Sequence, residues 1–154
     1  MEMRLMTPGD RETVLEMEDA LYHTDAIDHP VPQANMERAF ADAVGENPHL
    51  TGWLMEADGQ ATGFAYLTFF YSCEAGGNVV MLEELFVKDE LRGQGVGQQF
   101  MEWLYRQYPD AVRFRLEVTR GNPAAHLYAR NGFQFMDYDQ MVYDVENSKR
   151  TELG

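Results

Sequence analysis

The spacing of hydrophobic positions predicts two helices in the first third of this 154-residue chain. After Asp10, a residue type that caps helices, apolar positions recur every three or four residues through residue 21. The residues that share this face are Val14, Leu15, Met17, Glu18 and Leu21. A second helix is predicted over residues 36–44, with Asn35 as its cap and Gly45 at its end. Residues 4–6 form a short predicted strand before both helices.

The middle of the chain carries the patterns of strands. Residues 51–57 and 60–71 are rich in aromatic and other apolar side chains, and Asp58-Gly59 between them is a strong hairpin signal. Residues 81–87 predict another strand. In residues 112–118 apolar and polar side chains alternate, which is typical of a strand with one buried face.

Helical spacing returns in the second half. One apolar face of a predicted helix over residues 96–108 consists of Val96, Phe100, Trp103 and Leu104. A shorter helix begins at Asn122-Pro123 and ends near Asn131-Gly132. Residues 133–136 and 141–145 are predicted to form a closing pair of strands.

This order of elements predicts the fold class. An antiparallel hairpin followed by two strand–helix crossovers indicates an α/β fold of the α+β type, with a mixed, mostly antiparallel central sheet and helices on both faces. The chain length fits one domain with a real hydrophobic core. We therefore expect a single domain over residues 1–146 and a C-terminal tail over residues 147–154.

Charge and composition narrow the function classes. The formal net charge is −14, and residues 1–60 hold thirteen acids against three arginines, a balance of −10. Residues 85–130 hold seven basic residues against five acids, a balance of +2. Nucleic acid is a poor partner for such a chain, because phosphate binding needs a basic footprint. The acidic part fits either a solvated surface or a region that attracts a cation.

Other sequence features bear on location. The longest apolar-rich run, residues 64–71, is too short to span a membrane, and no secretory signal is visible at the start. Cys73 is the only cysteine, so an internal disulfide is impossible. We expect a cytoplasmic protein that needs no membrane partner.

The segment Arg92-Gly93-Gln94-Gly95-Val96-Gly97 is the most informative motif. It connects a predicted strand to a predicted helix, an arrangement in which glycines allow close backbone approach and helix N–H groups point at an anion. It is not a Walker loop, because Gly97 is followed by Gln98-Gln99 instead of Lys-Ser/Thr. Its alternate glycines also differ from the Rossmann spacing. The segment predicts a pyrophosphate site of another kind.

Two stretches together carry a family resemblance. The first is the strand at residues 82–87 followed by the glycine segment, and the second is Ala124-Ala125-His126-Leu127-Tyr128-Ala129-Arg130-Asn131-Gly132-Phe133. In both, the chain resembles the GNAT superfamily of acetyl-CoA-dependent N-acetyltransferases. The resemblance covers residues 79–135 well and the remainder only in its order of elements.

The resemblance implies an acetyl-CoA site. The backbone of Leu85, Phe86 and Val87 would pair with the pantetheine arm, and the amides of Gly93, Gln94, Gly95, Val96 and Gly97 would hold the pyrophosphate, with Arg92 adding charge. Tyr128 would protonate the departing thiolate, with Ala125 near it and Arg130 near the nucleotide. Asn122 is also implied as a CoA contact, although one residue fewer separates it from Tyr128 than is usual in the family.

Acetyl transfer to an amine also requires a base, because an alkylamine with a pKa of about 10.4 is mostly protonated at neutral pH. Glu83 matches a glutamate that acts through water in polyamine-acetylating members of the family, so we favour Glu83 as the base and Glu84 as the group that binds the substrate cation. Adjacent strand residues point to opposite faces, so only one of them is expected in a given cleft. A backbone N–H of Leu85 or Phe86 would stabilise the oxyanion.

The acceptor is expected to be a small cationic amine, such as a polyamine, a diamine or an aminoglycoside-like compound, that attacks acetyl-CoA directly in a ternary complex. Family members build the acceptor wall from their first helices, which implies that Glu18, Asp19, Tyr22, Asp25 and Asp28 line its entrance. Tyr138 would form the opposite wall.

Two alternative functions stay open at this point. The enzyme could acetylate protein lysines or N-termini, or the chain could be a non-catalytic CoA-binding module. His23 and His29, with the neighbouring aspartates, fit no zinc spacing, so no metal is expected. Homodimers are common in the family, and the run Phe69-Phe70-Tyr71 fits either the core or a dimer surface.

Overall fold

A five-stranded sheet organises the part of the chain that the computed structural model describes, residues 1–24 and 31–145. In chain order the elements are β1 (Glu2–Leu5), α1 (Arg11–Leu21), α2 (Gln33–Ala43), β2 (Leu50–Ala57), β3 (Gln60–Ser72), β4 (Gly77–Val87), α3 (Val96–Gln107), β5 (Arg113–Leu116) and α4 (Ala124–Arg130). Single 3-10 turns precede α1 and α3. The predicted tail, residues 147–154, lies outside the described residues. None of the described helices is long and apolar enough to cross a membrane.

The strands lie in chain order, β1-β2-β3-β4-β5. Neighbours from β1 to β4 are antiparallel, and only β5 runs parallel to β4, after the α3 crossover. Asp58 and Gly59 join β2 to β3 with φ of 52° and 75°, the left-handed values of a tight hairpin turn. The predicted α/β fold with a mixed, mostly antiparallel sheet is therefore confirmed.

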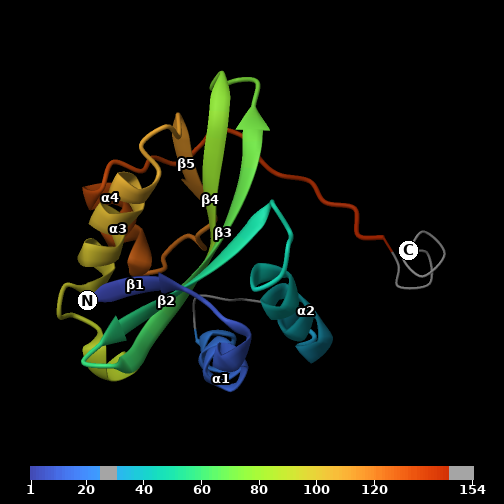
Figure 1. Ribbon diagram of the computed structural model, residues 1–154. Coiled ribbons are helices and arrows are strands. Elements are labelled where there is room, and N and C mark those ends of the chain that lie inside the picture. Colours follow the sequence, from blue (N-terminus) through green and yellow to red (C-terminus); the bar gives the residue numbers. More distant parts are fainter. Residues whose placement is uncertain (25–30, 146–154) are drawn as a thin grey trace.

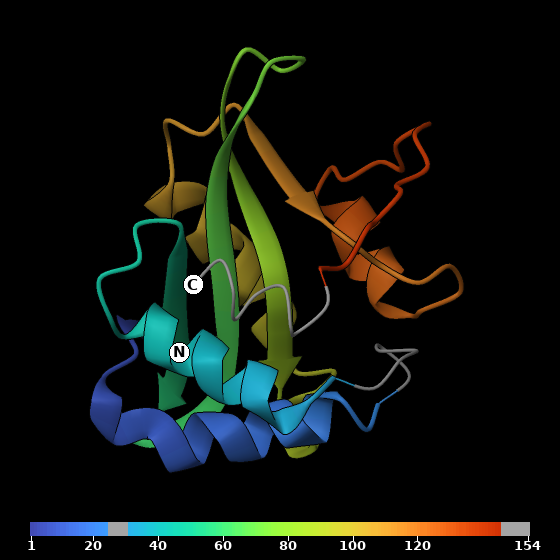
Figure 2. The same cartoon turned by 90° about the vertical axis from the view of Figure 1, so that its right-hand side faces the viewer.

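Helices cover both faces of this sheet. Figure 1 shows α1 and α2 on one side and α3 and α4 on the other, and Figure 2 shows α1 and α2 lying across the strands. Val14, Leu15 and Phe40 pack with Phe64 and Phe86 in one core cluster. The other cluster joins α3 to the opposite face of the strands through Phe100, Met101, Leu104, Leu67 and Leu82. The helical face predicted for residues 14–21 matches the buried positions of α1.

One predicted helix cap is wrong, and the other is right only in position. Helix α2 begins at Gln33, so Asn35 lies inside it, and the carbonyl of Pro32 accepts the first helical hydrogen bond, from the Asn35 N–H at 2.9 Å. Asp10 stands directly before α1 but its carboxylate makes no bond to that helix. It accepts instead from the Thr7 N–H at 2.7 Å and from Arg4, because an arginine offers a stronger, charged donor.

The predicted closing strands are also wrong in the described residues. Residues 133–136 and 141–145 have no strand pairing, and the strand predicted over residues 112–118 is reduced to Arg113–Leu116. A strand needs a partner along its whole length, and β5 pairs only with β4. The chain after α4 therefore runs beside the sheet without joining it.

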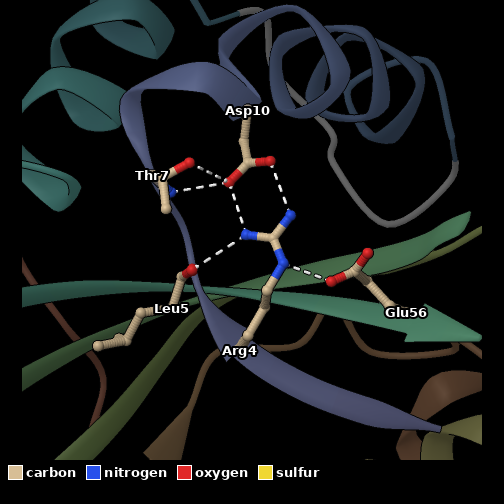
Figure 3. A network of polar contacts seen from close by, with 5 residues as sticks. All are labelled: Arg4, Leu5, Thr7, Asp10 and Glu56. Atoms are coloured by element: carbon tan, nitrogen blue, oxygen red, sulfur yellow. Dashed lines mark hydrogen bonds and ion pairs between the residues drawn. The ribbon is translucent and has the colours of Figure 1, made fainter. Parts of the chain in front are cut away.

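An ion-pair network ties the first strand to α1 (Figure 3). The Arg4 guanidinium donates to both carboxylate oxygens of Asp10, at 2.8 and 2.9 Å, and its Nε donates to Glu56 on β2. These hydrogen bonds from Arg4 lower the pKa of Asp10 to about 2 and raise that of Arg4.

We expect Asp10→Asn to lower the free energy of unfolding at pH 7 by about 1 kcal/mol. Because the folded pKa of Asp10 lies below its ordinary value of 3.8, the stabilisation is present above that value and is lost as the pH falls through about 2. Urea unfolding of both proteins at pH 7 and pH 2 measures this. A difference that is equal at both pH values would contradict the ion-pair explanation.

Candidate active site

Strand β4 loses its neighbour on one side halfway along. It pairs with β5 only from Val79 to Leu82, opposite Arg113 to Leu116. On the other side its pairing with β3 continues to Val87. Backbone N–H and C=O groups between Glu83 and Val87 are thus left without a strand on the β5 side, among the described residues. An extended, amide-containing ligand could pair with this edge as an additional strand would.

The glycine segment lies at the end of this open edge. Gly93 and Gly95 have φ of 79° and 82°, the left-handed region where a side chain would be strained. The first hydrogen bond of α3 runs from the Gln99 N–H to the Gly95 carbonyl, so the N–H groups of residues 96–98 are free of helical acceptors. Arg92 donates to the Val87 carbonyl at 3.2 Å and pairs with Asp89 at 3.1 Å. The segment can therefore bind an anion next to β4.

Helix α4 lies beside the start of α3. Gly97 allows this approach, since a Cβ there would lie 2.8 Å from a Leu127 methyl carbon. Gln98 and Asn131 exchange two side-chain hydrogen bonds, at 3.1 and 2.8 Å. Tyr128 is partly buried against the α3 cluster, with its ring centroid 5.9 Å from that of Phe133. Burial raises the pKa of Tyr128, so its phenol keeps its proton at neutral pH.

A β-bulge changes the directions of the two glutamates on β4. Tyr66 of β3 lies opposite Glu84 while Leu67 lies opposite Leu82, so Glu83 is an extra residue without a partner on β3. Glu83 accepts from the Thr68 hydroxyl at 2.8 Å, and Thr68 shares the β3 face of Tyr66. Both glutamates therefore lie on the α1 face of the sheet. The expectation that they point to opposite faces is wrong.

Glu84 belongs to a buried cluster of acidic and phenolic groups. Tyr22 of α1 donates a hydrogen bond to Glu84 Oε1, and the Tyr66 hydroxyl is buried without a hydrogen-bond partner in the described residues. Burial, and then the charge of Glu84, raise the pKa of Glu18, which is only 1% exposed. Glu18 is therefore protonated at neutral pH and shares its proton with Glu84, whose pKa is also raised by burial. Burial and the same carboxylate raise the pKa of Tyr22.

We expect Glu18→Gln to stabilise the fold at pH 8 by about 1–3 kcal/mol and to leave stability unchanged near pH 4. Folding raises the pKa of Glu18, because burial disfavours the charged carboxylate. The free energy of unfolding is therefore highest while Glu18 is protonated, and it falls as the pH rises above the ordinary value of 4.5. Glutamine removes the titration and still donates to Glu84. Thermal unfolding at both pH values measures the effect.

Glu16→Gln is the matched control, because Glu16 lies on the exposed face of the same helix. It should change the melting temperature at neither pH. A Glu18→Gln protein that is less stable than the parent at pH 8 would show that the carboxyl is charged in the folded state.

The remaining predicted residues are dispersed. Asp19 is exposed on α1, with its carbonyl 2.6 Å from His23 Nδ1. Asn122 accepts from the Ala124 N–H at 2.9 Å and so caps α4 locally. Tyr138 donates to Glu74 at the turn between β3 and β4, roughly 20 Å along β4 from Glu84. Arg130 is exposed in the last turn of α4. Asp25 and Asp28 lie outside the described residues.

Sequence reasoning missed Tyr66 and Thr68, which sit beside Glu84 and Glu83 on the neighbouring strand. The alternation of residues in β3 predicts that Tyr66 and Thr68 share a face, but it does not predict which residues of another strand lie beside them. That information comes from the register between β3 and β4. The cavities among the described residues include one of about 450 Å³ and one of about 1160 Å³. Tyr128 lines the larger one together with β5. No three His, Cys, Asp or Glu side chains in the described residues gather as a metal site would require.

Comparisons with known proteins agree on one family. The sequence profile of the acetyltransferase (GNAT) family matches residues 13–133. The chain is 31% identical over 135 residues to the thialysine N-ε-acetyltransferase of Sus scrofa, an alignment that covers 80% of this chain and 78% of that protein.

Solved structures share the fold. A possible acetyltransferase from Clostridium difficile 630 superposes with a TM-score of 0.79 at 16% identity, over 95% of this chain and 98% of that one. The aminoglycoside N-acetyltransferase AAC(6')-Iy, in complex with the bisubstrate analog CoA-S-monomethyl-acetylneamine, superposes with a TM-score of 0.74 at 19% identity, over 94% of this chain and 97% of that one.

Proposed function

The chain belongs to the acetyltransferase (GNAT) family and is an acyltransferase, and on this premise we propose that it moves an acetyl group from acetyl-CoA to the primary amine of a small cationic acceptor. The observation that carries the acceptor class is the pair of carboxyls at Glu83 and Glu84 on the α1 face of β4, with Glu18 of α1 beside Glu84. The relative from Sus scrofa is named for acetylating the ε-nitrogen of thialysine.

Acetyl-CoA would bind along the open edge of β4. Leu85, Phe86 and Val87 have no strand partner on the β5 side, which supports pairing of their backbone with the amides of the pantetheine arm. The free N–H groups at the start of α3, with Gly93 and Gly95, support pyrophosphate binding. Arg92 would add positive charge there, once its guanidinium turns from Asp89 to the phosphates. Ala125 lines the cavity beside Tyr128 and would contact the same ligand.

The acceptor ammonium must lose two protons, one before the attack and one after it, and the departing thiolate must gain one. Glu83, exposed beside the Thr68 hydroxyl, takes a proton from the bound ammonium through water. The neutral amine forms the new N–C bond as the C–S bond breaks, with a Leu85 or Phe86 N–H stabilising the oxyanion. Tyr128 then donates its phenolic proton to the departing thiolate, and the second proton, lost by the acylated nitrogen, restores the neutral phenol, so that one proton in net leaves through Glu83 to solvent.

Glu84 would bind the acceptor's positive charge. Its carboxylate is held by the Tyr22 hydroxyl and by the proton shared with Glu18, both on α1. An ammonium that contacts Glu84 replaces lost hydration with a charge-assisted hydrogen bond. The balance of −10 over residues 1–60 attracts such a cation from solution.

A matched amine panel tests the acceptor class. Initial rates of thiol release from acetyl-CoA would be compared between diamines and amino alcohols of equal chain length. We expect kcat/KM to be at least about tenfold higher for the dications, the gain of one charge-assisted contact. A preference for neutral or acidic amines, or for lysine-containing peptides over every small amine, would contradict the proposal.

We also place the enzyme in the cytoplasm, where the absence of a second thiol to pair with Cys73 is ordinary. Fractionation of cells that express a tagged chain checks this location, and recovery in an oxidising compartment would contradict it.

A further inference from the structure

The polar atoms buried behind Glu84 are not all hydrogen-bonded. Glu18 is 1% exposed, and its Oε2 has no hydrogen-bond partner in the described residues. The hydroxyl of Tyr66, a side chain that is 2% exposed, also lacks a partner there. Buried polar atoms in folded proteins nearly always have partners, because an unpartnered one costs free energy. Two such atoms beside each other indicate a second arrangement in which both are used.

The two unpartnered atoms belong to one cluster. Tyr66 on β3 lies opposite Glu84 on β4, and Tyr22 of α1 donates to Glu84 Oε1. Burial, and next the charges of Glu18 and Glu84, raise the pKa of the Tyr66 phenol. Its hydroxyl therefore lies close to both carboxyls. Glu18, Tyr22, Tyr66 and Glu84 are here named the acidic cluster.

The groups around the acidic cluster offer it no positive charge. Helix α1 packs on α2, β3 and β4, and α2 contributes the apolar Met36 and Phe40 to this core. The further charged neighbour on β4 is Glu83, which together with burial raises the pKa of Glu84. No lysine, arginine or histidine in the described residues forms an ion pair with Glu18 or Glu84. Repulsion between two ionised carboxyls leaves such a pair with one proton until a cation arrives.

We propose, on the basis of the proposed function, that a cationic acceptor exchanges for the proton that Glu18 and Glu84 share. The ammonium binds Glu84, one proton leaves the pair for the solvent, and Glu18 becomes charged. The ionised Glu18 accepts a hydrogen bond from the Tyr66 hydroxyl, so both unpartnered atoms gain a partner. Glu18 thus acts through Glu84, as a positioning residue that sets the affinity for the acceptor's charge.

Charge balances in this exchange. The free pair carries one negative charge and one proton, and the occupied pair carries two negative charges beside the acceptor cation. Because the proton and the amine compete for the acidic cluster, each weakens the binding of the other by the same factor. Amine affinity therefore rises with pH, and a bound amine lowers the pH at which the pair loses its proton.

Calorimetric titration with the diamine putrescine counts the released protons. CoA fills the cofactor site and, because it carries no acetyl group, permits no turnover. The binding heat is measured at pH 7 in PIPES and in ACES, whose ionisation enthalpies differ, so the difference in heat gives the number of protons that the buffer takes up. We expect about one proton per putrescine bound, and an association constant that rises about tenfold per pH unit.

Glu18→Gln is the decisive variant, because glutamine still donates to Glu84 but has no proton to release. Its proton count should be about zero, and its affinity for putrescine should change by less than about twofold between pH 6 and pH 8. Glu83→Gln is the matched control. A proton that the base takes from the acceptor is absent in this variant, whereas the proton of the pair is still released.

Tyr66→Phe tests the second arrangement. It keeps the buried ring and removes the donor to the ionised Glu18, so the affinity for putrescine should fall about tenfold at pH 8 and by about twofold or less at pH 6. An equal loss of affinity at both pH values would show that Tyr66 has only a structural role and would contradict the exchange.

The outcomes separate this exchange from the proposed function. A parent enzyme that acetylates putrescine and binds it without releasing a proton overturns the exchange and leaves the proposed function standing. A parent that neither binds nor acetylates a cationic amine contradicts both. Proton release that persists in Glu18→Gln and disappears in Glu83→Gln would assign the proton to the acceptor, which also overturns the exchange. The count in the parent needs no variant, so it decides even where a variant misfolds.

Discussion

We expect replacement of Tyr128 by phenylalanine to lower kcat by about 10²-fold and to leave KM for acetyl-CoA within about twofold. The variant keeps the ring that packs 5.9 Å from Phe133 and removes only the hydroxyl. Burial raises the pKa of Tyr128, so the parent enzyme holds the proton that the departing thiolate needs at neutral pH. Steady-state kinetics with acetyl-CoA and a cationic acceptor measures both constants.

Tyr105→Phe is the matched control for this experiment. Tyr105 lies on α3, burial raises the pKa of its phenol as well, and its hydroxyl donates to the Asn131 carbonyl at 2.7 Å. Loss of that hydrogen bond should cost about 1 kcal/mol of stability and little turnover. If Tyr128→Phe stays within about twofold of the parent in kcat, the acid role is wrong. Equal loss in both variants would indicate a structural cause.

Glu83→Gln is expected to lower kcat/KM by about 10²-fold at pH 7. The ratio of kcat/KM between the parent and the variant should become smaller as the pH rises. Without a base the reaction depends on the amine fraction that is already neutral, which grows about tenfold per pH unit below an amine pKa of about 10.4. The measurement is the pH profile of kcat/KM for both proteins. A constant ratio between pH 7 and 9 would exclude Glu83 as the base.

Glu84→Gln separates binding from proton transfer. Its carboxylate is held by Tyr22 and Glu18, so we expect a higher KM for the amine with a smaller change in kcat. If Glu84→Gln instead reproduces the pH-dependent loss expected for Glu83→Gln, the roles of the two residues are reversed.

Much of the fold is predictable because its signals are local. The helical spacing of Val14, Leu15 and Leu21 identifies the buried face of α1, and Asp58-Gly59 identifies the hairpin. The glycine segment likewise marks the start of α3, since left-handed residues before a helix require glycine at Gly93 and Gly95.

The predictions failed where a residue or segment can interact with more than one partner. Asp10 has the type and position of a helix cap, but Arg4 from β1 and Thr7 take its carboxylate. Residues 141–145 have the composition of a strand, yet a strand is defined by pairing, and their own sheet supplies none in the described residues. The sequence of a segment shows which hydrogen bonds and pairings it is able to form. Which of them it forms depends on the other groups that compete for the same partners in the folded chain.

The sequence by itself determined the order of elements, the apolar face of each helix, the glycine segment and the presence of Glu83, Glu84 and Tyr128 near it. Only the tertiary structure decided how these groups are aimed. Tyr66 and Leu67 are adjacent on β3, but their partners on β4, Glu84 and Leu82, are separated by Glu83. This extra residue forms the bulge, which brings both glutamates to the α1 face. Packing of α1 then joins Tyr22 to Glu84 across 62 positions of sequence. Periodicity describes neighbours within one element, whereas register and packing are set between elements, so the acidic cluster forms only when the sheet and α1 meet.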